Sequence, residues 1–294
     1  MTSEPGNSGG PLLLYIAGYG RSGSTMLARL LAQDQGVLNV GEVALAAWVL
    51  STSKKTCPCG AALRECPVWK PVWHDGLQTN RHTADAATHR AILEAIVASQ
   101  PAMRVIVDSS KSCGSLALRA FQLRSLAMGP VGATGAMDGI RVIHLVRDPR
   151  GVLWSQLRDG VRKGRPLSFW AVFSRGLRTS LGWLLANLAA ELYGLVHRRS
   201  YTRLTYERLM VSGLPPALQA SGGAGSLQGR TVGSALGNNH DIGGNRLKRR
   251  PAREIQSDDS WRDALPKPAS ALVTALCWPL MLRYGHIPTR APRA

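Results

Sequence analysis

The chain has 294 residues, of which 45% are hydrophobic, so it can bury a sizeable core and is not a largely disordered protein. Its length favours one domain with loop insertions over two domains. The net charge is +18 and uneven, because residues 161–294 carry 20 Lys and Arg against 7 Asp and Glu, whereas residues 1–160 carry 16 against 11. A surface this basic attracts phosphorylated ligands, nucleic acid or an anionic membrane, and the charge alone does not choose among them.

Four apolar runs rich in β-branched residues predict buried strands, and helical patterns follow the first three. The predicted strands are residues 12–17, 104–107, 141–146 and 202–205, and the predicted helices are residues 24–32, 116–127 and 151–157. Buried strands that alternate with helices are typical of a parallel sheet covered on both faces. We therefore expect an α/β fold with a P-loop-like parallel sheet flanked by helices. Ligands bind beyond the carboxyl ends of such strands.

The remaining segments are less regular. We expect residues 1–10 to be a disordered N-terminus, residues 11–287 to form the domain, and residues 288–294 to be a tail. Within the domain, residues 51–82 are a Cys- and Pro-rich insert and residues 221–244 are a mobile glycine-rich loop. Residues 168–196 predict a long helix or a helix pair that covers the core.

No signal peptide is visible at the start of the chain, so a cytoplasmic protein is expected. The longest apolar stretch, residues 181–196, contains Asn187 and Glu191 and is too short and too polar for a free-standing membrane span. A chain without a secretory signal does not use its five cysteines as a disulfide framework.

The loop after the first strand, Gly18 to Thr25, has the sequence Gly-Tyr-Gly-Arg-Ser-Gly-Ser-Thr and opens a helix. Backbone N–H groups in such a loop converge on an anion, and the helix N-terminus adds partial positive charge. We predict a phosphate-binding loop here rather than an ordinary glycine-rich turn. A P-loop kinase is disfavoured, because Ser24 stands where the essential Walker lysine would be.

A dinucleotide site is the other alternative for this loop. Gly18, Gly20 and Gly23 match its glycine spacing, and Glu42 follows 19 residues after Gly23. That pattern does not call for Arg21 inside the turn, and it explains none of the motifs further along the chain.

Cations and hydroxyls follow the second and third strands. Lys111, in Asp-Ser-Ser-Lys, can neutralise charge on a transferring group, or it can be a solvated side chain beside a helix cap. Arg147 and Ser155, eight residues apart, can hold one phosphate from two sides. In the alternative interpretation Arg147 pairs with Asp148 and Ser155 is a small packing residue.

The combined pattern resembles the sulfotransferases that use 3′-phosphoadenosine-5′-phosphosulfate (PAPS), in the bacterial and protein-tyrosine or carbohydrate branches. The similar segments are the Arg-Ser-Gly-Ser-Thr loop, Gly41-Glu42, Asp-Ser-Ser-Lys at 108–111, Arg-Asp-Pro-Arg at 147–150, Thr-Tyr-Glu-Arg-Leu at 205–209, Gly-Asn-Arg at 244–246 ahead of Trp261, and the cysteine segment at 57–69. They cover most of residues 12–285. Arg208, where an Asp is usual, and Gly243, where a Ser is common, depart from the family pattern.

The resemblance implies a role for each motif. The 5′-phosphosulfate would be bound by Arg21, Ser22, Gly23, Ser24 and Thr25. The 3′-phosphate would be bound by Arg147 and Ser155, with Tyr206 near the same end and with Asn245 and Arg246 closing over the nucleotide. The basic residues Lys248, Arg249 and Arg250 either help there or form a solvated or membrane-facing patch.

The chemistry of sulfuryl transfer needs alignment, a base for the incoming hydroxyl, and cations for the spreading oxygen charge. Glu42 is the predicted base, although alone it would be interpreted as a surface residue that starts a helix. Arg21 and Lys111 would stabilise the bridging and leaving oxygens, so no metal is required. Adenosine-3′,5′-bisphosphate would be the nucleotide product.

The cysteines at 57, 59 and 66, with His74, raise the possibility of zinc, but their spacing is unusual for a zinc site. A structural turn or a reversible Cys57–Cys66 bridge is the favoured interpretation. We expect His74, His82 and His89 to be surface residues.

The acceptor is expected to be a hydroxyl of a small molecule, a glycan or a lipid. Five tryptophans form either an acceptor wall or part of the core, with Trp183 assigned to the core: Trp48, Trp69, Trp73, Trp170 and Trp183. Nucleic acid is not an expected partner, because residues 246–253 hold basic but no aromatic side chains. Peripheral contact with membranes is a further hypothesis from the basic C-terminal half.

Overall fold

The structure of the chain is a computed structural model. It describes residues 10–52, 56–77, 83–111, 118–127, 139–162, 164, 167–215, 218, 231–232, 238–243, 253–254 and 256–287.

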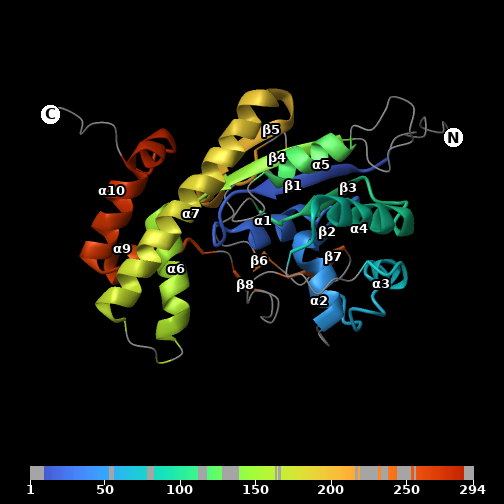
Figure 1. Cartoon of the computed structure of the whole chain (residues 1–294), viewed down its shortest axis with the longest axis horizontal. Helices are drawn as coiled ribbons and strands as arrows, with labels where there is room; N and C mark the ends of the chain where they lie inside the picture. Colours follow the sequence, from blue (N-terminus) through green and yellow to red (C-terminus); the bar gives the residue numbers. More distant parts are fainter. Residues whose placement is uncertain are drawn as a thin grey trace.

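A six-stranded parallel sheet lies at the centre of the described residues, in the order β5-β4-β1-β3-β2-β7 (Figure 1). Its strands are β1 (Leu12–Ala17), β2 (Val37–Gly41), β3 (Val105–Asp108), β4 (Gly139–Val146), β5 (Tyr201–Thr205) and β7 (Asn239–Ile242). A short antiparallel pair joins β6 (Thr231–Val232) to β8 (Arg253–Glu254). The predicted α/β class with a parallel sheet is confirmed.

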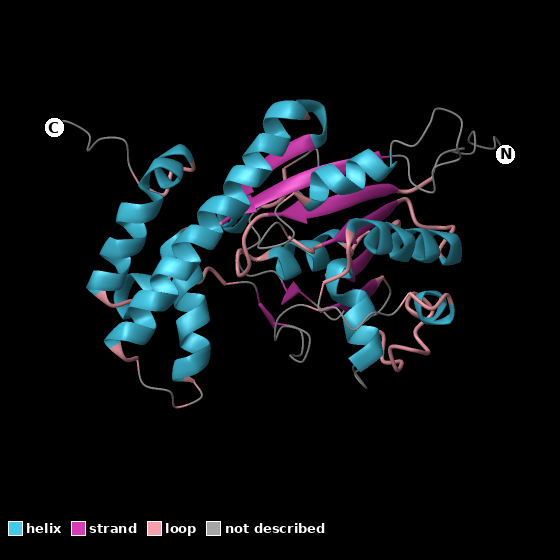
Figure 2. Ribbon diagram, in the orientation of Figure 1, coloured by secondary structure: helices cyan, strands magenta, loops and turns pink. Residues whose placement is uncertain are grey.

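Helices connect the strands and pack against the sheet (Figure 2). The α-helices are α1 (Ser24–Leu31), α2 (Ala46–Thr52), α3 (Lys70–His74), α4 (Ala86–Ser99), α5 (Arg119–Ala127), α6 (Pro149–Val161), α7 (Phe169–Val196), α8 (Tyr206–Ser212), α9 (Trp261–Ala264) and α10 (Lys267–Arg283). Two 3-10 turns, η1 (Val43–Leu45) and η3 (Arg198–Ser200), complete the described elements. The segment predicted over residues 168–196 is the single helix α7 rather than a pair, and the hydroxyl of Ser168 caps it by accepting from the N–H of Ala171.

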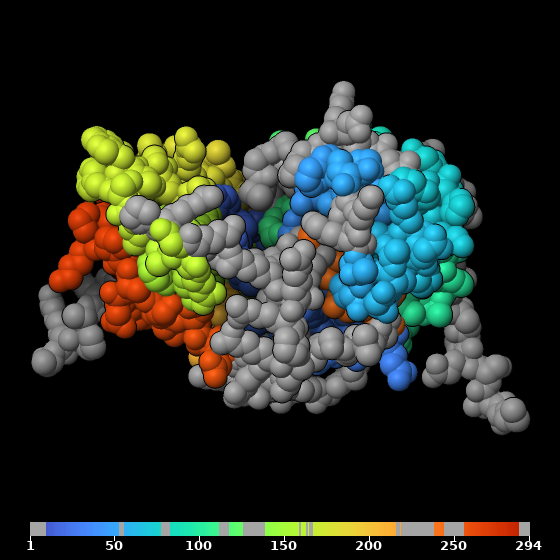
Figure 3. Space-filling view, turned by 90° about the horizontal axis from the view of Figure 1, so that it is seen from below, coloured from blue at the N-terminus to red at the C-terminus, as the bar shows by residue number. Residues whose placement is uncertain are grey.

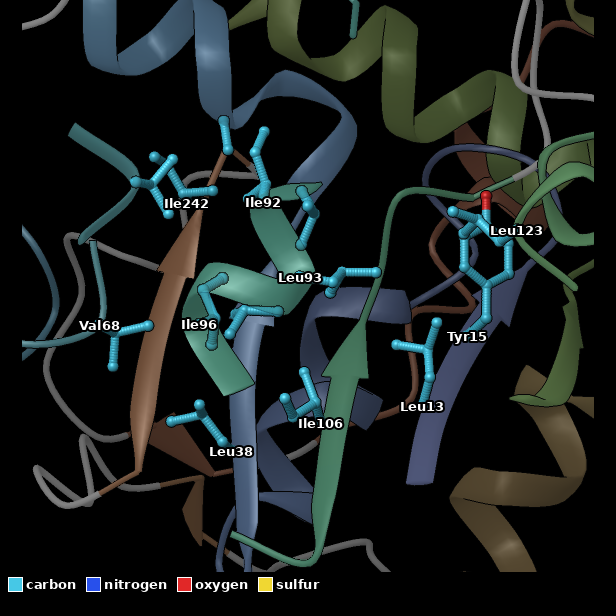
Figure 4. Packing of buried hydrophobic residues seen from close by; sticks show 14 of the residues in the cluster. Leu13, Tyr15, Leu38, Val68, Ile92, Leu93, Ile96, Ile106, Leu123 and Ile242 are labelled. Atoms are coloured by element: carbon cyan, nitrogen blue, oxygen red, sulfur yellow. The ribbon is translucent and has the colours of Figure 1, made fainter. Parts of the chain in front are cut away.

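The two faces of the sheet bury two separate apolar clusters, because side chains alternate along each strand. On β1, Leu13 and Tyr15 point to the face covered by α4 and α5, whereas Leu14 and Ile16 point to the face covered by α1 and α8. Figure 4 shows Ile92, Leu93 and Ile96 of α4 projecting onto the first of these faces. Burial of this kind stabilises a fold by roughly 25 cal/mol per Å² of apolar surface.

A third apolar cluster lies among α6, α7, α9 and α10, beyond the end of the sheet. Trp183 is completely buried there, as predicted, whereas Trp170 is 74% exposed. In Figure 3 the surface of these helices and the surface of α2 and the insert lie on opposite sides of the view, and dark-blue atoms of the N-terminal part of the chain lie between them. Tyr19, in the loop after β1, packs against the cluster formed by these helices.

Two strands of the sheet were not predicted. The sequence of β2 contains Asn39 and ends in a glycine, and β7 is polar in three of its four residues. The prediction of a mobile loop over residues 221–244 is wrong for residues 239–242, which form β7. Their polar groups have partners in neighbouring elements: Asn39 of β2 donates from Nδ2 to Oδ1 of Asn239 at 2.7 Å, and Asp241 lies 3.5 Å from the guanidinium of Arg29 on α1. The segments 219–230, 233–237 and 244–250 lie outside the described residues.

The outer surface of α7 is apolar along much of its length. Leucines spaced three or four residues apart are exposed along it, at positions 177, 181, 185, 188, 192 and 195. Even so, no helix in the described parts of the chain is both long enough and apolar enough to cross a membrane.

Candidate active site

The loop between β1 and α1 is folded in a way that only glycine permits at two positions. Gly18 has φ +121°, and a Cβ there would lie 2.3 Å from the carbonyl oxygen of Leu145 on β4. Gly23 has φ +95°, and a Cβ there would lie 2.9 Å from the ring of Tyr206. The glycines therefore let the loop pass close to its neighbours, as a loop that wraps an anion requires.

Donor groups of this loop remain available for a ligand. The N–H groups in the first turn of α1 have no intrahelical partner, as in any α-helix, and no side chain of a described residue caps them. The hydroxyl of Ser22 is buried and has no hydrogen-bond partner among the described residues. A buried hydroxyl without a partner costs about 1–3 kcal/mol, which a bound oxyanion would recover. Ser24 and Thr25 are buried in the first turn of the same helix.

Arg147, at the end of β4, reaches this loop from 126 residues away in the sequence. Its Nη1 donates to the carbonyl of Arg21 at 3.2 Å, and its guanidinium carbon lies 4.4 Å above the centre of the Tyr206 ring. Its Nη2 donates to the carbonyl of Asp258 at 3.0 Å. Arg147 and Tyr206 thus lie side by side. The alternative pairing of Arg147 with Asp148 is not observed, because Asp148 pairs with Arg150 at 2.7 Å.

Asp258 is the acidic partner of two arginines at this end of the site. Its carboxylate lies 3.3 Å from Arg147 and 3.0 Å from Arg158 of α6. Burial alone would raise the pKa of Asp258, but the hydrogen bond from Ser260 and the two guanidinium groups outweigh it and hold that pKa below its usual range. Burial also raises the pKa of the Tyr206 phenol, so this tyrosine stays neutral. Two guanidinium groups and one carboxylate leave a net positive charge at this end of the site.

The other predicted donor-site residues divide into two groups. Ser155 is buried on α6, the helix that starts directly after Arg147. Asn245 and Arg246, with the basic residues that follow them, lie outside the described residues.

Glu42 and Lys111 are brought together at the ends of β2 and β3. Nζ of Lys111 forms an ion pair with Oε1 of Glu42, and their side chains are only 12% and 14% exposed, respectively. The alternatives of a solvated lysine and a surface glutamate are therefore wrong. The backbone of Glu42 is fixed as well, because its N–H donates to the carbonyl of Ile242 on β7 at 2.7 Å.

A network of buried hydrogen bonds fixes the end of β3, just before Lys111. The carboxylate of Asp108 accepts from the N–H and the hydroxyl of Ser110 at 2.8 and 2.5 Å and contacts Nε2 of His89 at 2.7 Å. The Ser110 hydroxyl in turn accepts from the N–H of Ala44, two residues after Glu42. Arg119 lies on the other side of the imidazole, 3.2 Å from Nδ1. These groups position the two candidate catalytic side chains.

His89 corrects one prediction. It was expected at the surface, but it is fully buried. It lies on the stripe that α4 turns toward the sheet, with Ile92, Leu93 and Ile96 at the i+3, i+4 and i+7 positions. That spacing was present in the sequence and could have identified it.

In the described part of the chain, the non-glycine residues with positive φ are Arg21 and Lys111, both at +71°. This conformation costs of order 1–3 kcal/mol for a residue with a side chain and persists only where the surroundings impose it. At Lys111 those surroundings are β1, since the Lys111 N–H donates to the carbonyl of Ile16 at 3.2 Å and its carbonyl accepts from the Tyr15 hydroxyl. Such strain clusters at functional sites.

The site thus combines a loop with available hydrogen-bond donors, an arginine that stacks on a tyrosine, and a carboxylate paired with a lysine. All lie beyond the carboxyl ends of parallel strands, where ligands bind in this class of fold. A comparison with protein families finds that the model of the "Sulfotransferase family" matches residues 13–211, which is most of the chain and includes the loop, Glu42, Lys111, Arg147 and Tyr206. The chain belongs to the sulfotransferase family. A sulfotransferase moves a sulfuryl group to an acceptor, and the cationic loop and the Glu42–Lys111 pair suit that chemistry.

Solved structures similar to this sulfotransferase are also sulfotransferases. The sulfotransferase domain from the curacin biosynthetic pathway is 16% identical, with 93% of this chain and 98% of that chain covered and a TM-score of 0.46. The domain from the Synechococcus PCC 7002 olefin synthase is 17% identical, with 95% and 98% covered and a TM-score of 0.44. The sulfotransferase from Alicyclobacillus acidocaldarius is 13% identical, with 90% and 95% covered and a TM-score of 0.39. These TM-scores are below 0.5, so the assignment rests on the family model.

A search of curated proteins found no match to this sulfotransferase.

Proposed function

We propose that this sulfotransferase takes its sulfuryl group from PAPS and transfers it to a hydroxyl of a small molecule, a glycan or a lipid. The observation that carries the proposal is the contact of Arg147 with the loop at Arg21, together with its stacking on Tyr206. A loop that binds one phosphate is common to many nucleotide sites, whereas a second, separate cation at its edge suits a nucleotide with a second phosphate.

The donor would lie between the loop and the end of β4. The N–H groups of the loop, with Ser22, Ser24 and Thr25, would bind the 5′-phosphosulfate, and Arg21 would add its positive charge. Arg147 and Ser155 would bind the 3′-phosphate, with Asn245 and Arg246 closing over the nucleotide. Asp258 would keep the guanidinium of Arg147 in place through the 3.3 Å ion pair and the 3.0 Å bond to its carbonyl.

Glu42 would act as the general base. As the oxygen of the acceptor forms its bond to sulfur, its proton passes to the carboxylate of Glu42. The bond between sulfur and the bridging oxygen breaks in the same displacement, and its electron pair stays on the phosphate of adenosine-3′,5′-bisphosphate. Lys111 and Arg21 would stabilise that oxygen, and Lys111 is already in contact with Glu42. Because these side chains supply the charge, the reaction needs no metal ion.

Calorimetric titration with adenosine-3′,5′-bisphosphate, compared with 5′-AMP, tests this proposal. The bisphosphate should bind more tightly, and Arg147→Ala should remove most of the difference. Charge-assisted hydrogen bonds contribute about 1.5–3 kcal/mol, so we expect an affinity loss of roughly 10- to 150-fold.

Arg104→Ala is the matched control. Arg104 directly precedes β3, at the amino end of the strand and therefore at the end of the sheet opposite the site. There it pairs with Asp34 and is 70% exposed. The variant removes the same charge without touching the site, so bisphosphate binding should not change. Equal affinity for the bisphosphate and 5′-AMP in the unmodified protein would contradict PAPS as the donor.

A further inference from the structure

Three cysteines and one histidine converge beside β7, outside the site described above. Cys57, Cys59 and Cys66 come from the Cys- and Pro-rich insert, and His240 lies on the edge strand more than 170 residues later. Their sulfur and nitrogen atoms all lie within 4.8 Å of one another. Three of the four residues are buried and Cys59 is half-buried.

The distances match those of a tetrahedral metal site. With zinc–sulfur bonds of 2.3 Å and zinc–nitrogen bonds of 2.0–2.1 Å, neighbouring sulfurs lie about 3.8 Å apart and a sulfur and a nitrogen about 3.6 Å apart. The Sγ atom of Cys66 lies 3.5 Å from that of Cys57 and 3.8 Å from that of Cys59. Nδ1 of His240 lies 3.6 Å from Sγ of Cys57 and 3.1 Å from Sγ of Cys66. A small displacement at most would place all four atoms around one ion.

The backbone of the insert orients these ligands by local hydrogen bonds. The N–H of Cys57 donates to the carbonyl of Ala61 and the N–H of Gly60 to that of Cys57, which closes a tight turn with Gly60 at φ +94°. The N–H of Cys66 donates to the carbonyl of Ala62. The turn therefore presents Cys57, Cys59 and Cys66 to the same point despite their unusual spacing.

A hydrogen bond from the insert also fixes the backbone of His240. Nε1 of Trp69 donates to the carbonyl of His240 at 2.8 Å, so the backbone next to the imidazole is fixed to the insert. His74, the histidine that the sequence suggested as a fourth ligand, is exposed. His74 is the histidine nearest to the cysteines along the chain, whereas the fold supplies His240 from β7.

We propose that Cys57, Cys59, Cys66 and His240 bind a structural zinc ion. Three thiolates and one imidazole form a donor set that suits zinc, and four protein ligands leave no open position for catalysis. The ion would fasten the insert to β7. The N–H of Glu42 donates a hydrogen bond to the carbonyl of Ile242, which also lies on β7. The ion would therefore also stabilise the surroundings of the candidate base. This inference does not depend on the identity of the sulfuryl donor.

Metal analysis of the purified full-length protein, equilibrated with zinc and desalted, is the direct test. We expect about one zinc per chain. Cys59→Ser and His240→Ala should each lose most of it. His74→Ala and Cys277→Ala are the matched controls, since they remove an exposed histidine of the insert and a buried cysteine of α10, both outside the cluster, and they should retain the zinc.

A spectroscopic readout covers the case in which a ligand variant does not fold. Cobalt(II) added to the unmodified protein after zinc removal should give the intense visible bands of tetrahedral coordination and a thiolate-to-cobalt charge-transfer band in the near ultraviolet. Chelation should raise hydrogen exchange in residues 56–77 and 239–242 while leaving that of α10 unchanged. A protein that binds no zinc and no cobalt, or that carries a Cys57–Cys66 disulfide when purified without reductant, would overturn the proposal.

Discussion

Gly243 offers a way to displace the candidate base without altering it. The residue has φ +74°, and a Cβ at this position would lie 2.9 Å from Cβ of Glu42 and 3.5 Å from its Oε2. Ordinary van der Waals contact begins at 3.4 Å, so Gly243→Ala must push Glu42 and residue 243 apart by about half an ångström. Catalytic groups must be held within about 0.5 Å of their working geometry.

The expected magnitude follows from two separate effects. An alanine at positive φ costs about 1–2 kcal/mol of folding free energy. The displacement of Glu42 should lower kcat by roughly 10- to 100-fold, because a misplacement near 1 Å can cost about 100-fold. Binding of adenosine-3′,5′-bisphosphate should change much less than kcat, since the loop and Arg147, which would hold both phosphates, are not touched.

Gly285→Ala is the matched control for the strain. Gly285 follows α10 at φ +77°, and a Cβ there would meet nothing within 4 Å. It should show the same loss of stability with unchanged kcat. The assay measures adenosine-3′,5′-bisphosphate released from PAPS with a panel of alcohols, sugars and lipid hydroxyls, beside urea unfolding of both variants. Full activity in Gly243→Ala, or an equal loss of activity in both variants, would refute the role given to Glu42.

Two further predictions concern the loop and the core. Ser22→Ala should weaken bisphosphate binding in calorimetry by about 10-fold without lowering the free energy of unfolding, because the buried hydroxyl that it removes has no partner among the described residues. Burial lowers the pKa of His144 from 6.5 to about 4, so its contribution to stability is complete above pH 6.5 and is lost as the pH falls to 4. Between these pH values the free energy of unfolding should fall by about 3 kcal/mol in urea titrations, and His144→Gln should lack that part of the fall.

The parts of the fold that the sequence predicted are those with local periodicity. The apolar runs of β1 and β4 predicted strands because each is buried on both faces, and α7 carries its own N-cap at Ser168. The contact of Arg147 with the loop is consistent with this sheet, since Arg147 and the loop that holds Arg21 each come after a predicted strand, and parallel strands have their carboxyl ends on the same side of the sheet.

The parts that the sequence did not predict depend on partners distant in the chain. The polar strand β7 is stable because Asn239 meets Asn39 and Asp241 meets Arg29. His240 faces cysteines that lie more than 170 residues earlier. Nothing in the sequence near these residues indicates such contacts, because polar residues in series are also typical of loops.

The pairing of β2 with β7 sets the order in which the protein can be assembled during synthesis. Asn39 and its partner Asn239 are 200 residues apart, so at 5–20 residues per second the edge of β2 waits about 10–40 s for its neighbour. During that interval the N–H and C=O groups of β2 on this side have no strand to pair with, and such an edge is a template for aggregation. The Glu42 backbone, which is tied to Ile242, is fixed only after this late step. The yield of active enzyme in cells should therefore depend on the translation rate and on chaperones that shield the unpaired edge of β2.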